Sequence, residues 1–137
     1  DNITFHLEVH SDPAPLAQQL HGMGLKAGLS INPDMPVEKA LPFLKHFDYL
    51  LVMSVFPGFG GQKFIPSALT KISAAREYVK ANGLTTRIEV DGGVDINNAA
   101  TVVAAGADIL VMGTGFFGRI DRAEIVQLVA GLQPVRG

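Results

Sequence analysis

The sequence predicts an α/β fold built on a parallel β-sheet, and two observations carry this prediction. Five short apolar runs alternate with five helix-like runs along the 137 residues, and such alternation produces β-α units whose strands pair in parallel. The third apolar run, residues 48–55, is hydrophobic almost throughout, as expected for a strand covered on both faces. No Asn-Gly or Asp-Gly turn links two of the runs. An open doubly wound sheet and a closed barrel both fit this pattern.

The composition describes a single globular domain and excludes several classes of partner. With 47% hydrophobic and 18% charged residues, the chain can bury one core. A net charge of -2 and a pI near 6.1 argue against binding to nucleic acid or to an anionic membrane surface. No apolar run reaches the roughly 20 residues of a membrane span. The absence of cysteine excludes disulfides, thiolate metal sites and a cysteine nucleophile, and it favours a reducing, cytoplasmic setting.

Each expected element is bounded by residues that start or stop regular structure. The strands are expected at residues 3–9, 25–31, 48–55, 87–91 and 108–112. The helices are expected at residues 12–22, 36–46, 66–82, 95–105 and 121–131. Pro13 and Pro15 fall in the first turn of the first helix, where a missing N–H is harmless, whereas Pro42 should kink or split the second. Glycines end the helices, and Asp95 and Asp121 are placed to cap the last two.

Glycine is concentrated just after three consecutive strands. Residues 56–62 read Phe-Pro-Gly-Phe-Gly-Gly-Gln, residues 91–93 read Asp-Gly-Gly, and residues 113–115 read Gly-Thr-Gly. The carboxyl ends of parallel strands gather at one end of the sheet, where glycine-rich backbone can direct several N–H groups at a phosphate. One such loop would indicate only a short turn, but three neighbouring loops favour a phosphate site. The spacing matches neither GxGxxG nor the P-loop pattern, which disfavours a nucleotide.

Asp91 is the candidate reactive group, because the apolar run around Ile88 and Val90 delivers it to a strand tip directly before two glycines. The alternative is that Asp91 only caps the following helix, and the residues alone leave both interpretations open. Met53, near the end of the third strand, is interpreted either as a core residue or as an apolar wall of a pocket. The histidines show no metal-ligand spacing, and His6 is interpreted as structural.

Four segments together resemble the ribulose-phosphate 3-epimerase family. They read Lys-Ala-Gly-Leu-Ser-Ile-Asn-Pro at 26–33, Leu-Val-Met-Ser-Val at 51–55, Pro-Gly-Phe-Gly-Gly-Gln-Lys-Phe-Ile at 57–65 and Glu-Val-Asp-Gly-Gly-Val at 89–94. Residues 3–8, 105–108 and 113–114 continue the match in order. The combination of the glycine-rich run with a downstream Val-Asp-Gly-Gly is its most specific part.

The resemblance implies a TIM-type (β/α)8 barrel in which this chain supplies roughly strands 4–8, with residues 1–137 forming the C-terminal part of a single domain. It implies interconversion of D-ribulose 5-phosphate and D-xylulose 5-phosphate, in which two aspartates exchange the C3 proton through an enediolate. One divalent metal ion (Zn, Fe, Mn or Co) would stabilise the enediolate oxygen. By position, Asp91 is one catalytic aspartate and a metal ligand. The substrate would contact Met53, Gly58, Phe59, Gly60, Gly61, Gly92, Gly93, Gly113 and Thr114.

The chain departs from the family pattern in two places. The family's βα units that supply the second catalytic aspartate, two histidine ligands and a further aspartate are not among these residues. We therefore expect the chain to be the C-terminal part of a longer enzyme, and the resemblance also implies a homo-oligomer. In addition, Gly113-Thr114-Gly115 stands where Gly-Ser is usual. Threonine keeps a hydroxyl for the phosphate but leaves the choice among ketose phosphates open.

Three alternative functions stay open on the sequence. The first is epimerisation of a six-carbon ketose phosphate such as allulose 6-phosphate. The second is a non-catalytic phosphosugar-binding fragment, if nothing completes the barrel. The third is another phosphate-binding barrel, such as an aldolase or a decarboxylase. No lysine lies at a predicted strand tip, which argues against an aldolase that forms a Schiff base.

Overall fold

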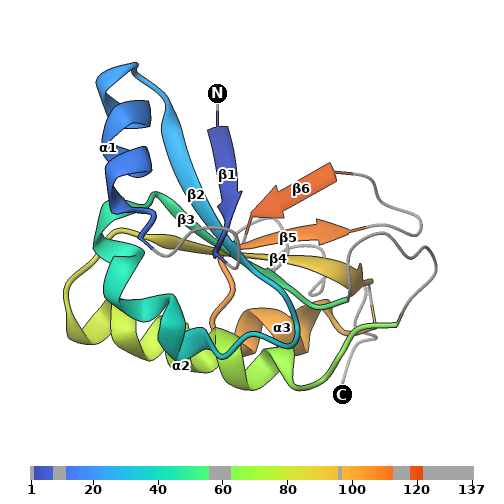
Figure 1. The fold of residues 1–137 in the computed structure, drawn as a ribbon. Helices are drawn as coiled ribbons and strands as arrows, with labels where there is room; N and C mark the ends of the chain where they lie inside the picture. The colour runs from blue at the N-terminus through green and yellow to red at the C-terminus, as the bar shows by residue number, and fades with distance from the viewer. Residues whose placement is uncertain (1, 8–11, 56–62, 96, 113–117, 122–137) are drawn as a thin grey trace.

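A computed structural model describes residues 2–7, 12–55, 63–95, 97–112 and 118–121, and it contains one curved β-sheet. The strands are β1 (Asn2–His6), β2 (Lys26–Ile31), β3 (Tyr49–Met53), β4 (Arg87–Val94), β5 (Ile109–Met112) and β6 (Gly118–Asp121). They lie side by side in chain order, as Figure 1 shows. β1 to β5 pair in parallel, whereas β6 runs antiparallel to β5. The predicted parallel α/β fold is therefore confirmed.

The order of the strands separates the two architectures that the sequence leaves open. In a doubly wound sheet the chain reverses direction at a switch point, so consecutive strands cannot all be neighbours. Here each parallel strand pairs with the next one in the chain, as in a (β/α)8 barrel. The helices α1 (Ala14–Gly22), α2 (Ala68–Ala81) and α3 (Ala99–Ala105) lie on one side of the sheet. Among the described elements, no helix covers the other, concave face.

Two local predictions differ from the structure. The helix expected at residues 36–46 is instead a pair of short 3-10 helices, η2 (Val37–Lys39) and η3 (Leu41–His46). The predicted split at Pro42 is confirmed, because Pro42 lies in the first turn of η3, where its missing N–H is tolerated. The strand β6 was not expected, because Gly118–Asp121 has no apolar alternation. It pairs with all four residues of β5, which would otherwise present an open edge. The helix expected at 121–131 lies outside the described residues, apart from Asp121.

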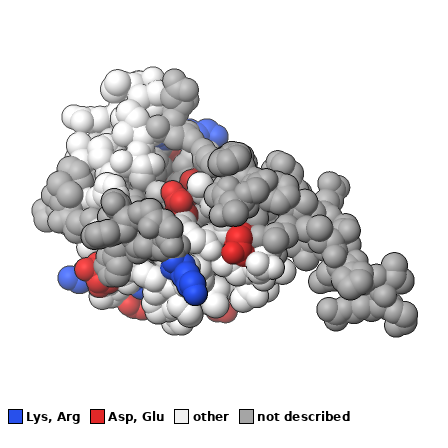
Figure 2. Space-filling model, turned by 90° about the vertical axis from the view of Figure 1, so that its right-hand side faces the viewer, with Lys and Arg blue, Asp and Glu red and all other residues white. Residues whose placement is uncertain are grey.

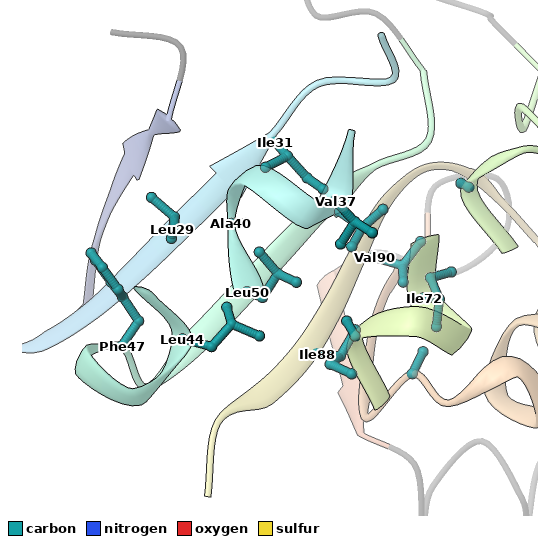
Figure 3. Packing of buried hydrophobic residues seen from close by; sticks show 14 of the residues in the cluster. Leu29, Ile31, Val37, Ala40, Leu44, Phe47, Leu50, Ile72, Ile88 and Val90 are labelled. Carbon is teal, nitrogen blue, oxygen red and sulfur yellow. The ribbon is translucent and has the colours of Figure 1, made fainter. Parts of the chain in front are cut away.

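The core lies between the sheet and the helices. Leu50 and Val52 of β3 and Ile88 and Val90 of β4 are fully buried on the helix-facing side, against Ile72 of α2. Figure 3 shows this packing from close by. Burial of each such side chain contributes about 1.5–3 kcal/mol. The alternate residues of β3, by contrast, are partly exposed on the concave face. Its nearly continuous apolar sequence predicted burial on both faces, and the described residues bury only one.

Candidate active site

The candidate site lies at the carboxyl end of β3 and β4, on the concave face of the sheet. Met53 is the register partner of Asp91, which in turn pairs with Val111 of β5. Residues at matched positions of parallel strands project to the same face, so the predicted acid and the predicted apolar wall are neighbours. Figure 2 views the molecule from the side on which β4 and β5 end in Figure 1. The described residues of that face carry separate acidic and basic side chains, with no continuous basic patch.

Asp91 has the electrostatic character of a functional carboxyl group. Its side chain is half-buried, and this burial raises the pKa of Asp91 above its ordinary value, because loss of water disfavours the charged form. A carboxyl group with a raised pKa can accept and return a proton, and a nearby cation would stabilise its charged form. Such perturbed groups at strand ends are characteristic of active sites.

The alternative role of Asp91, capping the next helix, belongs to Asp95. The Asp95 carboxylate accepts hydrogen bonds from the backbone N–H groups of Asn97 (2.8 Å) and Asn98 (3.2 Å), just before α3 begins. The Asn98 side chain completes this turn by donating to the carbonyl of Gly93 and accepting from the N–H of Asp95. Asp95 thus holds the turn that leads into α3, whereas α3 itself begins at Ala99, later than predicted, and its N-cap residue Asn98 has no side-chain cap hydrogen bond.

Gly92 and Gly93 occupy backbone conformations that other residues rarely adopt. Their φ angles are +126° and +69°. A Cβ on Gly92 would lie 2.6 Å from the Cγ2 atom of Val55, and one on Gly93 would collide with the backbone of Phe64. These two glycines do not form a tight turn that leads the chain out of the sheet, because both lie within β4. β4 continues to Val94, and its pairing with β5 shifts register between Asp91 and Val94.

Ser54, which sequence reasoning missed, joins these parts of the site. Its N–H donates to the carbonyl of Asp91 (2.9 Å), and its hydroxyl donates to the carbonyl of Gly92 (2.5 Å). The Ser54 carbonyl accepts from the N–H of Ile65 (2.8 Å), and the residue is fully buried. The only sequence signal was a serine between Met53 and the glycine-rich run.

Lys71 also approaches this end of the sheet, although none of the described lysines lies at the carboxyl end of a strand. Its ammonium group extends from α2 and donates to the carbonyls of Asn32 (3.4 Å) and Pro33, which follow β2. Burial lowers the pKa of Lys71, while Asp34 and Glu38 oppose that shift. The lysine comes from the helix layer and holds backbone carbonyls. Sequence reasoning did not anticipate this contact, because it depends on how α2 packs.

The remaining predicted residues of the site cannot be placed. Gly58, Phe59, Gly60, Gly61, Gly113 and Thr114 lie outside the described residues. Within the described part of the chain, no group of three or more His, Asp or Glu side chains is arranged to hold a metal ion. Likewise, no described helix is both long enough and apolar enough to cross a bilayer.

Together, the sequential parallel strands, the outer helices and a carboxyl group at the strand ends define a TIM-barrel type of protein. A solved structure agrees at the level of the fold. The 3-dehydroquinate dehydratase from Geobacillus kaustophilus aligns with a TM-score of 0.54 and 15% identity, over 96% of this chain and 53% of that one.

The family follows from sequence comparison. Residues 1–117 match the model of the ribulose-phosphate 3-epimerase family, and the chain belongs to that family. A ribulose-phosphate 3-epimerase of Mycobacterium tuberculosis is 45% identical over 125 residues, which cover 91% of this chain and 55% of the relative. The enzyme of that name from Escherichia coli is 40% identical over 90% of this chain and 55% of the relative. The chain therefore spans about half the length of the curated relatives that it matches.

Proposed function

We propose that this chain is part of an enzyme that epimerises D-ribulose 5-phosphate and D-xylulose 5-phosphate at C3. The observation that carries the proposal is Asp91, a half-buried carboxyl group with a raised pKa at the end of β4. It lies beside Met53, in a chain of the ribulose-phosphate 3-epimerase family. Met53 offers an apolar contact to the carbon atoms of the sugar.

Asp91 would remove or return the C3 proton from one face of the substrate. Its raised pKa brings the acid and base forms closer to the working pH, which favours proton transfer in both directions. Inversion needs a second acid–base group on the opposite face of C3. We assign that group to βα units that complete the barrel outside residues 1–137, as the family resemblance implies.

A divalent metal ion fits the charge of this site. The Asp91 carboxylate is partly desolvated, and a bound cation would offset that cost. Asp91 would be one ligand, and the other ligands would come from the completing βα units. When bound, the ion would polarise the substrate carbonyl and so acidify the neighbouring C–H group. Zn, Fe, Mn and Co are the candidate metals.

The phosphate would be bound by backbone amides of the glycine-rich strand ends. The positive φ angles of Gly92 and Gly93 support this, because such backbone can turn consecutive N–H groups toward an anion. We assign the other phosphate contacts to residues 58–61, Gly113 and Thr114. We also infer a homo-oligomeric, cytoplasmic enzyme from the family resemblance and from the lack of cysteine.

Replacement of Asp91 tests the proposal. In the complete enzyme, Asp91→Asn should reduce turnover of D-ribulose 5-phosphate by several orders of magnitude and leave phosphosugar affinity within about threefold, because the amide keeps its shape but cannot accept the C3 proton. Exchange of the C3 proton with solvent deuterium should also be lost. Asp95→Asn is the matched control, since asparagine also caps turns, and it should remain active.

Each alternative function gives a different result. Faster turnover of D-allulose 6-phosphate than of the pentose phosphate would identify a hexose-phosphate epimerase. Phosphosugar binding without any turnover would identify a binding protein. Continued C3 exchange in Asp91→Asn would remove Asp91 from the proposed chemistry.

A further inference from the structure

Ser54 directs two consecutive backbone carbonyls of β4 to the same side. In a regular strand, successive carbonyls point to opposite neighbours. Here the carbonyl of Asp91 accepts from the N–H of Ser54, and the carbonyl of Gly92 accepts from its hydroxyl. The second contact is possible because Gly92 has a φ angle of +126°. One buried serine thus fixes two neighbouring peptide groups.

The consequence for the amides follows from peptide geometry. The described peptide bonds are all trans, and in a trans peptide the N–H group points opposite to the carbonyl. Because both carbonyls face Ser54, the N–H groups of Gly92 and Gly93 both face away from it. Both amides therefore lie on the β5 side of β4, where the register between the two strands shifts between Asp91 and Val94, and adjacent amides on one side can donate to a common anion.

Ser54 also connects this pair of amides to its surroundings. Its own carbonyl accepts from the N–H of Ile65, directly after Phe64, whose backbone contacts Gly93. The segment that follows the glycine-rich run, the bulged end of β4 and the end of β3 therefore meet at one residue. The Ser54 hydroxyl fixes the direction of the peptide between Gly92 and Gly93, and the Ser54 N–H holds the adjoining peptide that carries Asp91.

We propose that Ser54 is a positioning residue, which orients the Gly92 and Gly93 amides toward the substrate phosphate and holds Asp91 at the reacting carbon. The inference rests on the proposed function for the identity of the substrate. The arrangement links phosphate binding to placement of the acid–base group, because one residue holds both peptide groups, one through its hydroxyl and the other through its backbone N–H. Ser54 itself does not contact the substrate.

The test compares three variants of the complete enzyme. Ser54→Ala removes the hydroxyl, and Ser54→Thr retains it. Thr86→Val is the control for loss of a buried hydroxyl, because Thr86 is 4% exposed and its Oγ1 atom lies 2.7 Å from the carbonyl oxygen of Leu44, at the opposite end of the sheet. If Ser54→Ala does not fold, Ser54→Cys takes its place, since a thiol has similar size but is a weak donor.

The first measurement requires no turnover. Inorganic phosphate is titrated into protein labelled with ¹⁵N-glycine, and the amide signals of Gly92 and Gly93 are followed. We expect both signals to shift in the wild type, in Ser54→Thr and in Thr86→Val, and phosphate affinity to fall about tenfold in Ser54→Ala. Equal affinity in Ser54→Ala and Thr86→Val would overturn the inference, as would a wild type whose two amides do not respond.

The second measurement is turnover of D-ribulose 5-phosphate. We expect kcat to fall on the order of 10²-fold in Ser54→Ala, because a small displacement of a reacting group is costly, and KM to rise. Ser54→Thr should recover most of the activity, and Thr86→Val should lower only the unfolding temperature. A wild type without turnover would contradict the proposed function, while the phosphate titration would still decide the role of Ser54. Equal kcat values in Ser54→Ala and Thr86→Val would show that Ser54 is merely structural.

Discussion

At the residue scale, aspartates of this chain differ in what balances their charge. Burial opposes ionisation of Asp48, but the N–H of Ala27, the imidazole of His21 and the ammonium of Lys26 outweigh it and lower the pKa of Asp48. At Asp91 burial acts alone, and the pKa is raised. The fold thus leaves an uncompensated carboxylate at the strand ends, which is costly for stability and useful for chemistry.

This imbalance predicts that Asp91→Asn stabilises the metal-free protein at neutral pH. A carboxyl group whose pKa is raised on folding binds more protons in the folded state, so its contribution to stability falls as the pH rises above its ordinary pKa of 3.8. We expect a gain of about 0.5–1 kcal/mol at pH 7, kept small by partial exposure of the carboxylate. The gain should vanish below pH 3.

Urea unfolding of both proteins with a chelator present, repeated across this pH range, measures the effect. Asp95→Asn should show no such gain. A variant that is less stable than the wild type at pH 7 would contradict the assignment of Asp91 as an unbalanced charge.

At the element scale, an aspartate just before a strand begins the pairing of β3 with β2, and another begins the pairing of β5 with β4 in the same way. Asp48 precedes β3; its N–H donates to the carbonyl of Ala27, and its carboxylate accepts from the N–H of Ala27, both at 2.8 Å. Asp108 precedes β5 and makes the equivalent pair of contacts with Ile88 at 2.8 and 2.9 Å. Each aspartate thereby extends the parallel pairing by one position and fixes its register. These aspartates lie at the opposite end of the sheet from Asp91.

A side chain from the helix layer contacts each of these aspartates: His21 of α1 lies 2.8 Å from Asp48, and the contact at Asp108 predicts a large effect on stability. Arg76 of α2 pairs with Asp108 at 2.5 Å and donates to the carbonyl of Gly106 from both Nε (3.0 Å) and Nη2 (2.8 Å). Arg76→Met should cost about 2–3 kcal/mol, because it leaves a partly buried carboxylate and a helix-end carbonyl without their donor. Urea unfolding measures this cost.

Lys80→Met, one turn further along α2, is the control and should change the free energy of unfolding by less than about 0.5 kcal/mol. Turnover per folded molecule should be unaffected by either substitution, because both residues lie far from the carboxyl ends of the strands, where Asp91 is. An equal loss of stability in the two variants would mean that the contacts of Arg76 contribute nothing specific.

Many of the helices and strands could be predicted from the sequence, because apolar runs and the glycines that end helices act locally. The strands β1 to β5, α1, α2 and the turn at Asp95 followed from such signals. The failures have a common physical cause: β6 exists because β5 has an open edge, and Lys71 reaches the strand ends because α2 packs there. Ser54 was missed for the same reason, since its contacts with Asp91 and Gly92 bridge 37 and 38 positions of the chain. Sequence reasoning named Asp91 and Met53 separately, and their pairing as register partners on β4 and β3 is a finding of the structure.

At the scale of the whole molecule, the sheet is a segment of a barrel. Five parallel strands follow one another without a switch point, and the chain matches 55% of the length of its curated relatives. A (β/α)8 barrel has eight such strands and closes its concave face on itself. Met53, Glu89 and Asp91 are partly exposed on that face in the described structure. We therefore propose that the second acid–base group and the remaining metal ligands would face it from the βα units that complete the barrel.

The same arrangement predicts how a metal ion changes stability of the complete enzyme. A ligand that binds only the folded state stabilises it by RT ln(1 + [L]/Kd), about 2.7 kcal/mol at a hundredfold excess over Kd. Addition of Zn²⁺ or Mn²⁺ to the chelated wild type should raise its unfolding temperature and restore turnover. Asp91→Asn starts from a higher metal-free stability but should gain much less, so the order of the two proteins should reverse as metal is added. Asp95→Asn should follow the wild type, whereas equal metal-dependent shifts in all three proteins would show that Asp91 is not a ligand.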